Sequence, residues 1–172
     1  VALHFSDEKT ALLFQQYHQD NAGFTRFKKF KYLFEVLLNR KSFEEDYQQA
    51  LVMFSQMCMD QLIDCPLTKD AEKFLLQITD GSPKYIISAA SEEDLQHIFS
   101  EKGLDHLFTG IYGGPRTKTE IFADVLACHP NLKPIFFGDA KADYLVAEKY
   151  NVNFVFLSGY TEFTGWKGYF HK

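Results

Sequence analysis

The first third of the chain carries its hydrophobic residues at helical spacing. Apolar side chains recur every three or four positions through three successive stretches, at about residues 2–19, 27–38 and 42–62. This period is typical of amphipathic helices. Ser42 is the predicted N-cap of the third helix, because Glu44 and Glu45 follow it in the first turn. Residues 1–65 contain one glycine and no proline, and we predict that they form a small helical bundle.

After Pro66 the pattern changes to short apolar strands that alternate with helices. The expected strands are 85–87, 108–112, 134–137 and 153–157, and the expected helices are 68–79, 91–102, 118–128 and 141–150. Buried strands that are each reached through a helix build a parallel sheet. We therefore predict an α/β core over residues 66–172, with the α-helical domain of residues 1–65 in front of it. Ligands of such sheets bind at the carboxyl ends of the strands.

Composition narrows the class of protein. The 172 residues are 46% hydrophobic and 24% charged, which is ordinary for a globular chain. A net charge of −5 provides no basic field for nucleic acid, and no apolar run reaches the length of a membrane span. The cysteines are three in number and lack metal-ligand spacing, so we predict free thiols in a reducing, cytoplasmic compartment.

Polar groups follow two of the predicted strands in a way that suits an anion. Ser88 and Ala89 follow strand 85–87 and precede a helix, where a hydroxyl and backbone N–H groups can bind phosphate. Lys118 begins the helix after strand 108–112, although a cation there opposes the helix dipole. The alternative interpretations are a serine in an ordinary turn and a solvated surface lysine.

A pair of carboxylates follows the strand at 134–137. Gly138 allows a sharp turn at the strand end, Asp139 projects from the tip, and Asp143 lies in the first turn of the next helix. Two carboxylates that converge repel each other unless a cation lies between them, so the pair suggests Mg²⁺. The alternative is that both acids only complement the helix dipole.

Together these residues resemble the motifs of the haloacid dehalogenase superfamily of phosphohydrolases with a helical cap, which includes phosphoglycolate phosphatases and β-phosphoglucomutases. Ile86-Ile87-Ser88 resembles the second motif, Lys118 the third, and Gly138-Asp139 with Asp143 the fourth. The resemblance implies a Rossmann-like core and a cap over residues 1–65. It also implies catalytic roles for Ser88, Lys118 and Asp139, with Mg²⁺ held by Asp139 and Asp143.

The segment 21–30 resembles a stretch of the cap in relatives that lie among surface-polysaccharide genes. By this resemblance Gly23, Arg26 and Lys29 reach into the site and bind the substrate, together with Ser88, Ala89 and Lys118. The alternative is a helix start with a solvated basic face. The stretch 160–166 is predicted to be a loop that packs aromatic side chains near the cleft, and His18 is predicted to be a solvated or capping residue.

The sequence departs from the family at the first motif, Asp-x-Asp-Gly-Thr/Val, which supplies the nucleophile and the acid–base in relatives. Nothing in residues 1–30 matches it. In the family this motif ends the central strand, between the strands that here end at Ser88 and Asp139. We therefore expect about 20 to 30 further residues in front of Val1, from the usual size of such units.

The resemblance implies a Mg²⁺-dependent phosphoric monoester hydrolase that acts on a small phosphorylated metabolite through an aspartyl-phosphate. A phosphomutase on the same scaffold and a non-catalytic binding protein without the nucleophile remain open. A receiver-like or flavodoxin-like module fits poorly, because those modules carry no helical insert of this size. The expected partner is a small phosphate ester, without nucleic acid or membrane.

Overall fold

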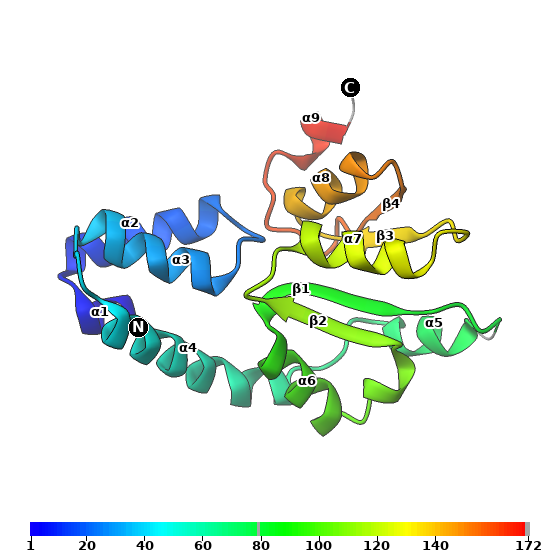
Figure 1. Cartoon of the computed structure of the whole chain (residues 1–172), viewed down its shortest axis with the longest axis horizontal. Helices are drawn as coiled ribbons and strands as arrows, with labels where there is room; N and C mark the ends of the chain where they lie inside the picture. The colour runs from blue at the N-terminus through cyan, green and yellow to red at the C-terminus, as the bar shows by residue number, and fades with distance from the viewer. Residues whose placement is uncertain (79, 171–172) are drawn as a thin grey trace.

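The computed structural model describes residues 1–78 and 80–170, apart from the side chain of Asp60. Its first part is helical, as predicted (Figure 1). The helices are α1 (Ala2–Phe5), α2 (Glu8–Asp20), α3 (Arg26–Tyr32), a π-helical continuation of α3 (Leu33–Leu37) and α4 (Glu44–Asp64). In the part of the chain described, no helix is both long and apolar enough to cross a membrane.

Two helix starts differ from the prediction. The helix expected over 2–19 is divided, because Asp7 caps α2 by accepting a hydrogen bond from the Thr10 N–H at 2.7 Å. The predicted cap Ser42 is wrong, since α4 begins at Glu44 with Phe43 as its N-cap. Phe43 instead stacks on Phe34, with ring centroids 5.6 Å apart, so the entry into α4 is fixed by packing.

Aromatic side chains form the core of the helical part. The buried cluster joins α2, α3 with its continuation, and α4. Its members are Phe14, Phe30, Leu33, Phe34, Ala50 and Leu51. All of them except Ala50 are apolar positions of the predicted helices, so the periodicity located most of this core.

The second part alternates strands and helices, as predicted. It comprises α5 (Ala71–Gln77), β1 (Tyr85–Ser91), α6 (Glu92–Glu101), a 3₁₀ turn (Asp105–Leu107), β2 (Gly110–Gly114), α7 (Lys118–Cys128), β3 (Ile135–Gly138), α8 (Lys141–Lys149), β4 (Asn153–Phe156) and α9 (Trp166–Phe170). Ser91 is the N-cap of α6, and its hydroxyl accepts from the Asp94 N–H at 3.4 Å. The mixed α/β class predicted from the sequence is confirmed.

The strands are parallel, as predicted, and form two separate pairs, β1 with β2 and β3 with β4. Alternation alone predicted one parallel sheet, whereas the resemblance placed a further, central strand between the strands that end at Ser88 and Asp139. A cavity of about 520 Å³ lies beside both β1 and β3 and is lined by Ile87 and Phe137 among others. One face of β3 and β4 is also open, since Ile135 is 55% and Val155 41% exposed. Alternation from helix to strand predicts parallel strands, but it does not predict which strands hydrogen-bond.

Two of the contacts between the helical and α/β parts lie beside the loop that joins α2 to α3. Arg26 at the start of α3 forms a buried ion pair with Asp94 of α6, with Nη1 and Oδ2 2.5 Å apart. Gly23, in the loop between α2 and α3, lies against Ala142 of α8. These contacts hold the loop of residues 21–25 close to the carboxyl ends of β1 and β3.

Candidate functional site

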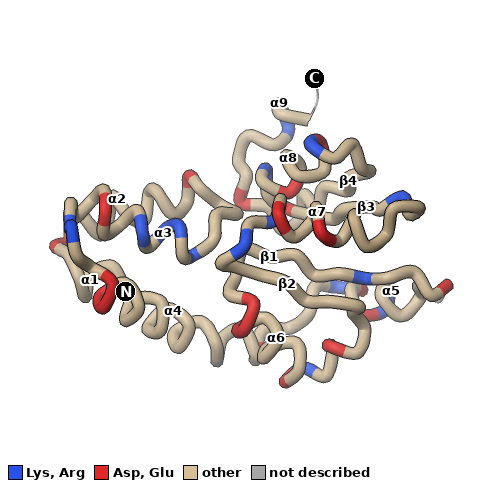
Figure 2. Tube along the Cα trace, in the orientation of Figure 1, with Lys and Arg blue, Asp and Glu red and all other residues tan. Residues whose placement is uncertain are grey.

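A polar cavity of about 640 Å³ lies between the helical part and the α/β part. Its walls come from the end of α2, from α3, from β1, from the start of α7, from the residues after β3 and from the loop 160–164. Six residues that the sequence singled out line it, namely Gly23, Lys29, Ser88, Ala89, Lys118 and Asp139. Figure 2 shows Lys and Arg residues along α3 and at the turn that leads into α7.

Ser88 and Ala89 lie where the pairing of β1 with β2 is interrupted. The register runs from Tyr85 to Ile87, breaks, and resumes only at Ser91. The Ser88 hydroxyl accepts a hydrogen bond from the Ala90 N–H at 3.2 Å, as in a serine turn. Both residues are half-buried. The predicted turn after strand 85–87 is therefore an irregular segment inside a longer strand, and it lines the cavity.

Lys118 is held in the site by a carboxylate. Its Nζ lies 2.5 Å from Oδ1 of Asp143, and the two side chains are only 15% and 4% exposed. Lys118 is the first residue of α7, whose N-terminus is already capped by Thr117 and Glu120. The alternative of a solvated surface lysine is wrong. A cation is stable at this helix start because Asp143 on α8 forms an ion pair with it.

Asp143 has both carboxylate oxygens engaged within the protein. Oδ1 bonds to Lys118, and Oδ2 accepts from the Ala140 N–H at 3.1 Å, which caps α8. Gly138 makes room for this arrangement, since a Cβ built there would lie 2.4 Å from the Asp143 Cβ. Gly138 was predicted to allow a sharp turn. The structure shows that its missing side chain is needed for this close approach.

Asp139 lines the cavity, as do two other carboxylate residues of the described chain, Asp20 and Glu162. Asp139 is exposed, while Asp143 does not line the cavity. Across the residues described here, no group of three or more His, Cys, Asp or Glu side chains is placed to hold a metal ion. Mg²⁺ commonly uses one or two protein carboxylates with waters and phosphate oxygens. Asp139 fits that donor set, whereas Asp143 in this arrangement serves Lys118.

The three residues of the segment 21–30 have different surroundings. Gly23 and Lys29 line the polar cavity, but Arg26 does not, because its guanidinium bonds to Asp94 and to Ser55 Oγ at 2.6 Å. Lys29 is 6% exposed and donates to the His18 carbonyl oxygen at 3.3 Å. Burial lowers the pKa of Lys29, and Glu162 partly offsets this. The alternative of a solvated basic face is therefore wrong for Arg26 and Lys29.

His18 and Glu162 also line the cavity, and the sequence analysis did not assign them to the site. Partial burial, followed by the charge of Lys29, lowers the pKa of His18. Glu162 belongs to the predicted loop near the cleft, which Thr161 ties to the site by donating to the Asp139 carbonyl oxygen at 2.5 Å. Neither residue lies in a motif, and only the folded chain brings them to the strand ends.

The glycine at position 23 provides a first testable prediction. Its φ is +91°, and a Cβ there would lie 2.7 Å from the Ala142 Cβ. We expect Gly23→Ala to lower the free energy of unfolding by at least about 1–2 kcal/mol from the backbone strain, with an added cost from the clash with α8. Urea denaturation measures this change.

Gly103→Ala is the matched control for this prediction. Gly103 has a φ of +63° but nothing within 4 Å of the added Cβ. Gly23→Ala should lower the free energy of unfolding more than Gly103→Ala does, and the difference measures the contact between the loop and α8. Equal losses would show that this contact places no steric constraint on the loop.

Comparison with known proteins gives fold relatives only. No family model and no curated protein matches the sequence. A haloacid dehalogenase-like hydrolase family protein from Streptococcus pneumoniae is 18% identical, with a TM-score of 0.53 over 76% of this chain and 67% of that one. A candidate phosphatase from Clostridium difficile is 21% identical, with a TM-score of 0.54 over 77% of this chain and 66% of that one.

At these identities the comparison establishes architecture. The chain spans about two thirds of each of these two structures. Two proteins that share a fold need not share a substrate or a mechanism. The resemblance predicted from the sequence is nevertheless confirmed at the level of the fold, and the chain has the fold of the haloacid dehalogenase-like hydrolases.

Proposed function

We propose that the protein is a Mg²⁺-dependent hydrolase of a small phosphate monoester. The observation that carries the proposal is the gathering of Ser88, Lys118 and Asp139 in one polar cavity at the ends of β1 and β3 and the start of α7. A hydroxyl, a cation and a hard oxygen ligand are the groups that a phosphoryl group requires. The hydrolase and phosphatase relationship of the two fold relatives supports the same class of reaction.

The residues of the chain would act mainly by positioning charge. In the net reaction the P–O bond to the alcohol breaks and water supplies the new oxygen on phosphorus, so the products are the alcohol and inorganic phosphate. The resemblance implies two steps, in which a carboxylate first displaces the alcohol and water then cleaves the aspartyl-phosphate. Negative charge is spread over the phosphoryl oxygens in each step. Lys118, held by Asp143, would lie against those oxygens. The Ser88 hydroxyl would donate a hydrogen bond to one of them, and Lys29 would approach them from α3. Donors fixed in advance stabilise such charge without reorganising.

Asp139 is the residue proposed to hold Mg²⁺, because its carboxylate is open to the cavity. A bound Mg²⁺ supplies positive charge beside the phosphate. The role of Asp143 as a second ligand stays a prediction from the resemblance, and its contacts favour the positioning of Lys118 instead.

A second candidate function is phosphate-ester binding without turnover. It would use the same polar cavity, with Ser88 and Lys118 against the phosphate. The 172 residues contain no Asp-x-Asp-Gly-Thr/Val motif, and the aspartyl-phosphate of the proposed reaction is not assigned to any residue named here. A phosphomutase would use the same phosphate site, and it differs in passing the group to a second hydroxyl instead of to water.

A panel of phosphate monoesters, assayed for release of inorganic phosphate with and without Mg²⁺, separates these functions. Hydrolysis stimulated by Mg²⁺ supports the proposal. Transfer within a sugar phosphate without release indicates the mutase. Binding of esters without either reaction indicates the binding protein.

Asp139→Asn should remove the stimulation by Mg²⁺ and leave the protein folded. The amide keeps the size of the carboxylate but loses the negative charge that attracts the ion. Rates measured across a range of Mg²⁺ concentrations test this, with Asp124→Asn on the exposed face of α7 as the control. Full stimulation by Mg²⁺ in Asp139→Asn would exclude Asp139 as the ligand.

His18 offers a test of anion binding that does not need turnover. Its pKa is lowered from 6.5 by partial burial and by the nearby charge of Lys29. We expect inorganic phosphate to raise the pKa of His18, because a bound anion favours the charged imidazolium. Proton NMR titration of the ring, with and without phosphate, measures the shift, and the resonance of His97 on α6 is the internal reference. An unmoved His18 titration in saturating phosphate would place the anion elsewhere.

A further inference from the structure

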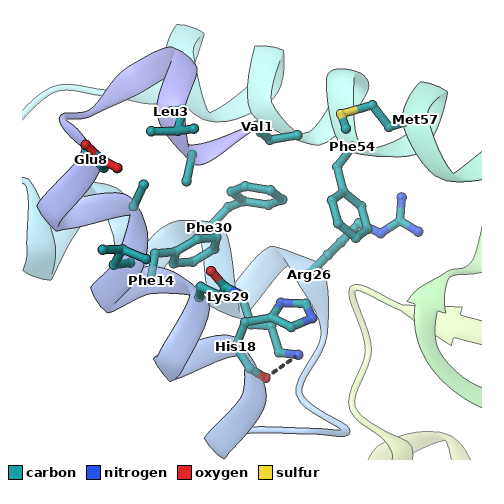
Figure 3. A pocket seen from close by; sticks show the side chains of 14 residues that line it. Val1, Leu3, Glu8, Phe14, His18, Arg26, Lys29, Phe30, Phe54 and Met57 are labelled. Carbon is teal, nitrogen blue, oxygen red and sulfur yellow. Dashed lines mark hydrogen bonds between the residues drawn. The ribbon is translucent and has the colours of Figure 1, made fainter.

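A second cavity lies inside the helical part, between α1, α2, α3 and α4 (Figure 3). Its volume is about 410 Å³, which falls in the range of about 300–1,000 Å³ that small-molecule sites occupy. The wall is mainly apolar, and Phe14, Phe30, Phe54 and Met57 are among the side chains that Figure 3 labels around it.

Large apolar side chains border this cavity without being buried. Leu12 and Met57 are each 60% exposed, although both lie on helices whose other faces are packed. Apolar surface left open beside a concave site is a feature of binding surfaces, because a ligand that covers it is favoured by the hydrophobic effect.

The apolar cavity adjoins the proposed phosphate site. His18 and Lys29 line both cavities. In Figure 3 they lie together at one end of the apolar wall, where the Lys29 ammonium donates to the His18 carbonyl oxygen at 3.3 Å. That bond uses one of the three donors that an ammonium carries. Lys29, a buried cation, thus has the apolar cavity on one side and the proposed phosphate site on the other.

We propose that the substrate is a phosphate monoester whose alcohol carries an apolar group, such as an alkyl chain or an aromatic ring. The phosphate lies against Ser88 and Lys118, the ester oxygen lies near Lys29, and the apolar group occupies the cavity bordered by Phe54 and Met57. This substrate class rests on the proposed function, and it excludes the small polar sugar phosphates as the preferred substrates.

Ethyl, butyl and hexyl phosphate test the proposal directly. They share one reacting group and differ only in apolar length. We expect kcat/KM to rise by about threefold to fourfold for each methylene that enters the cavity, the factor that corresponds to burial of one methylene. Equal kcat/KM values for the three esters would overturn the proposal.

Two variants of α4 locate the effect. Met57→Glu puts a carboxylate on the apolar wall, and we expect it to reduce the ratio of hexyl to ethyl phosphate turnover by at least about tenfold, which is comparable to the gain from two buried methylenes. Val52→Glu is the matched control, since Val52 is 54% exposed on the same helix and lies outside the cavity. A preference for hexyl phosphate that survives in Met57→Glu would overturn the assignment of the cavity.

Binding measurements separate failure of this inference from failure of the proposed function. If no ester is hydrolysed, the proposed hydrolase is excluded, and calorimetric titration with ethyl and hexyl phosphate still decides the apolar site. Tighter binding of hexyl phosphate, lost in Met57→Glu and kept in Val52→Glu, would support the site. Equal affinities would show that the cavity is only a packing gap between helices.

Discussion

We expect Lys118→Met to lower phosphate-ester turnover by about 10²–10³-fold, the usual effect of removing one group that stabilises charge in the transition state. The same substitution is expected to reduce the free energy of unfolding by about 3–5 kcal/mol, because it leaves a buried carboxylate without its partner. That carboxylate is Asp143, which is 4% exposed at its side chain and 2.5 Å from the Lys118 ammonium.

The two effects can be separated by a second substitution. In Lys118→Met/Asp143→Asn the buried charge is gone, and an amide oxygen at position 143 can still accept from the Ala140 N–H that caps α8. We expect the double variant to regain most of the lost stability in urea denaturation, because no unpaired charge remains buried. Turnover should stay low, since the cation that would contact the phosphate is still missing.

Arg116→Met is the control for breaking an ion pair as such. Arg116 pairs with Asp124 on α7, close to Lys118, but their side chains are 45% and 68% exposed. Exposed pairs contribute at most about 1 kcal/mol, so this variant should remain near wild type in stability and in turnover. Recovery of turnover in Lys118→Met/Asp143→Asn would show that Lys118 acts only through stability.

Lys118 and Asp143 also show how far the sequence could predict the site. The order of the elements placed Ser88, Lys118 and Asp139 at successive strand and helix ends, and the fold brings all three to one cavity. The pairing of Lys118 with Asp143 was not predictable, because it joins the first turns of two helices whose spacing depends on packing. A carboxylate that follows a strand can hold a metal ion or orient a lysine, and local pattern does not distinguish these roles.

The sheet shows the same limit for the fold. Apolar runs located the strands to within a few residues, because burial sets that pattern. Alternation alone did not show that β1 and β3 are unpaired, since long-range packing decides which parallel strands hydrogen-bond. The family resemblance did imply a gap there, because it placed a further strand between the strands that end at Ser88 and Asp139. His18 and Glu162 entered the site in the same way, through the approach of α2 and the loop 160–164 to the strand ends.

Substitution of Arg26 is expected to have the second large effect. The structure and the family resemblance predict different results for phosphate binding in this variant. The resemblance places Arg26 on the substrate. In the structure its Nη1 bonds to Asp94 of α6 at 2.5 Å and to Ser55 of α4 at 2.6 Å, and its guanidinium lies over the Phe54 ring. Ser55 Oγ also donates to Asp94 at 3.0 Å, so one buried network joins α3, α4 and α6.

We expect Arg26→Met to reduce the free energy of unfolding by about 3–5 kcal/mol, because Asp94, with a side chain 12% exposed, loses its buried partner. The affinity for inorganic phosphate, measured by calorimetry below the unfolding transition, should stay within about twofold of wild type, since Arg26 lies outside the polar cavity. Lys29→Met is the matched comparison on the same helix, because Lys29 is equally buried but lines that cavity.

Lys29→Met should therefore weaken phosphate binding, since a cation beside the anion is removed. It should cost less stability than Arg26→Met, because burial already lowers the pKa of Lys29 and its charged form gains little from folding. If Arg26→Met weakened phosphate binding as much as Lys29→Met does, the guanidinium would have to leave Asp94 and reach the ligand. The contact between α3 and α6 would then be a state that the substrate displaces, and the loop of residues 21–25 would close on the phosphate only as that ion pair opens.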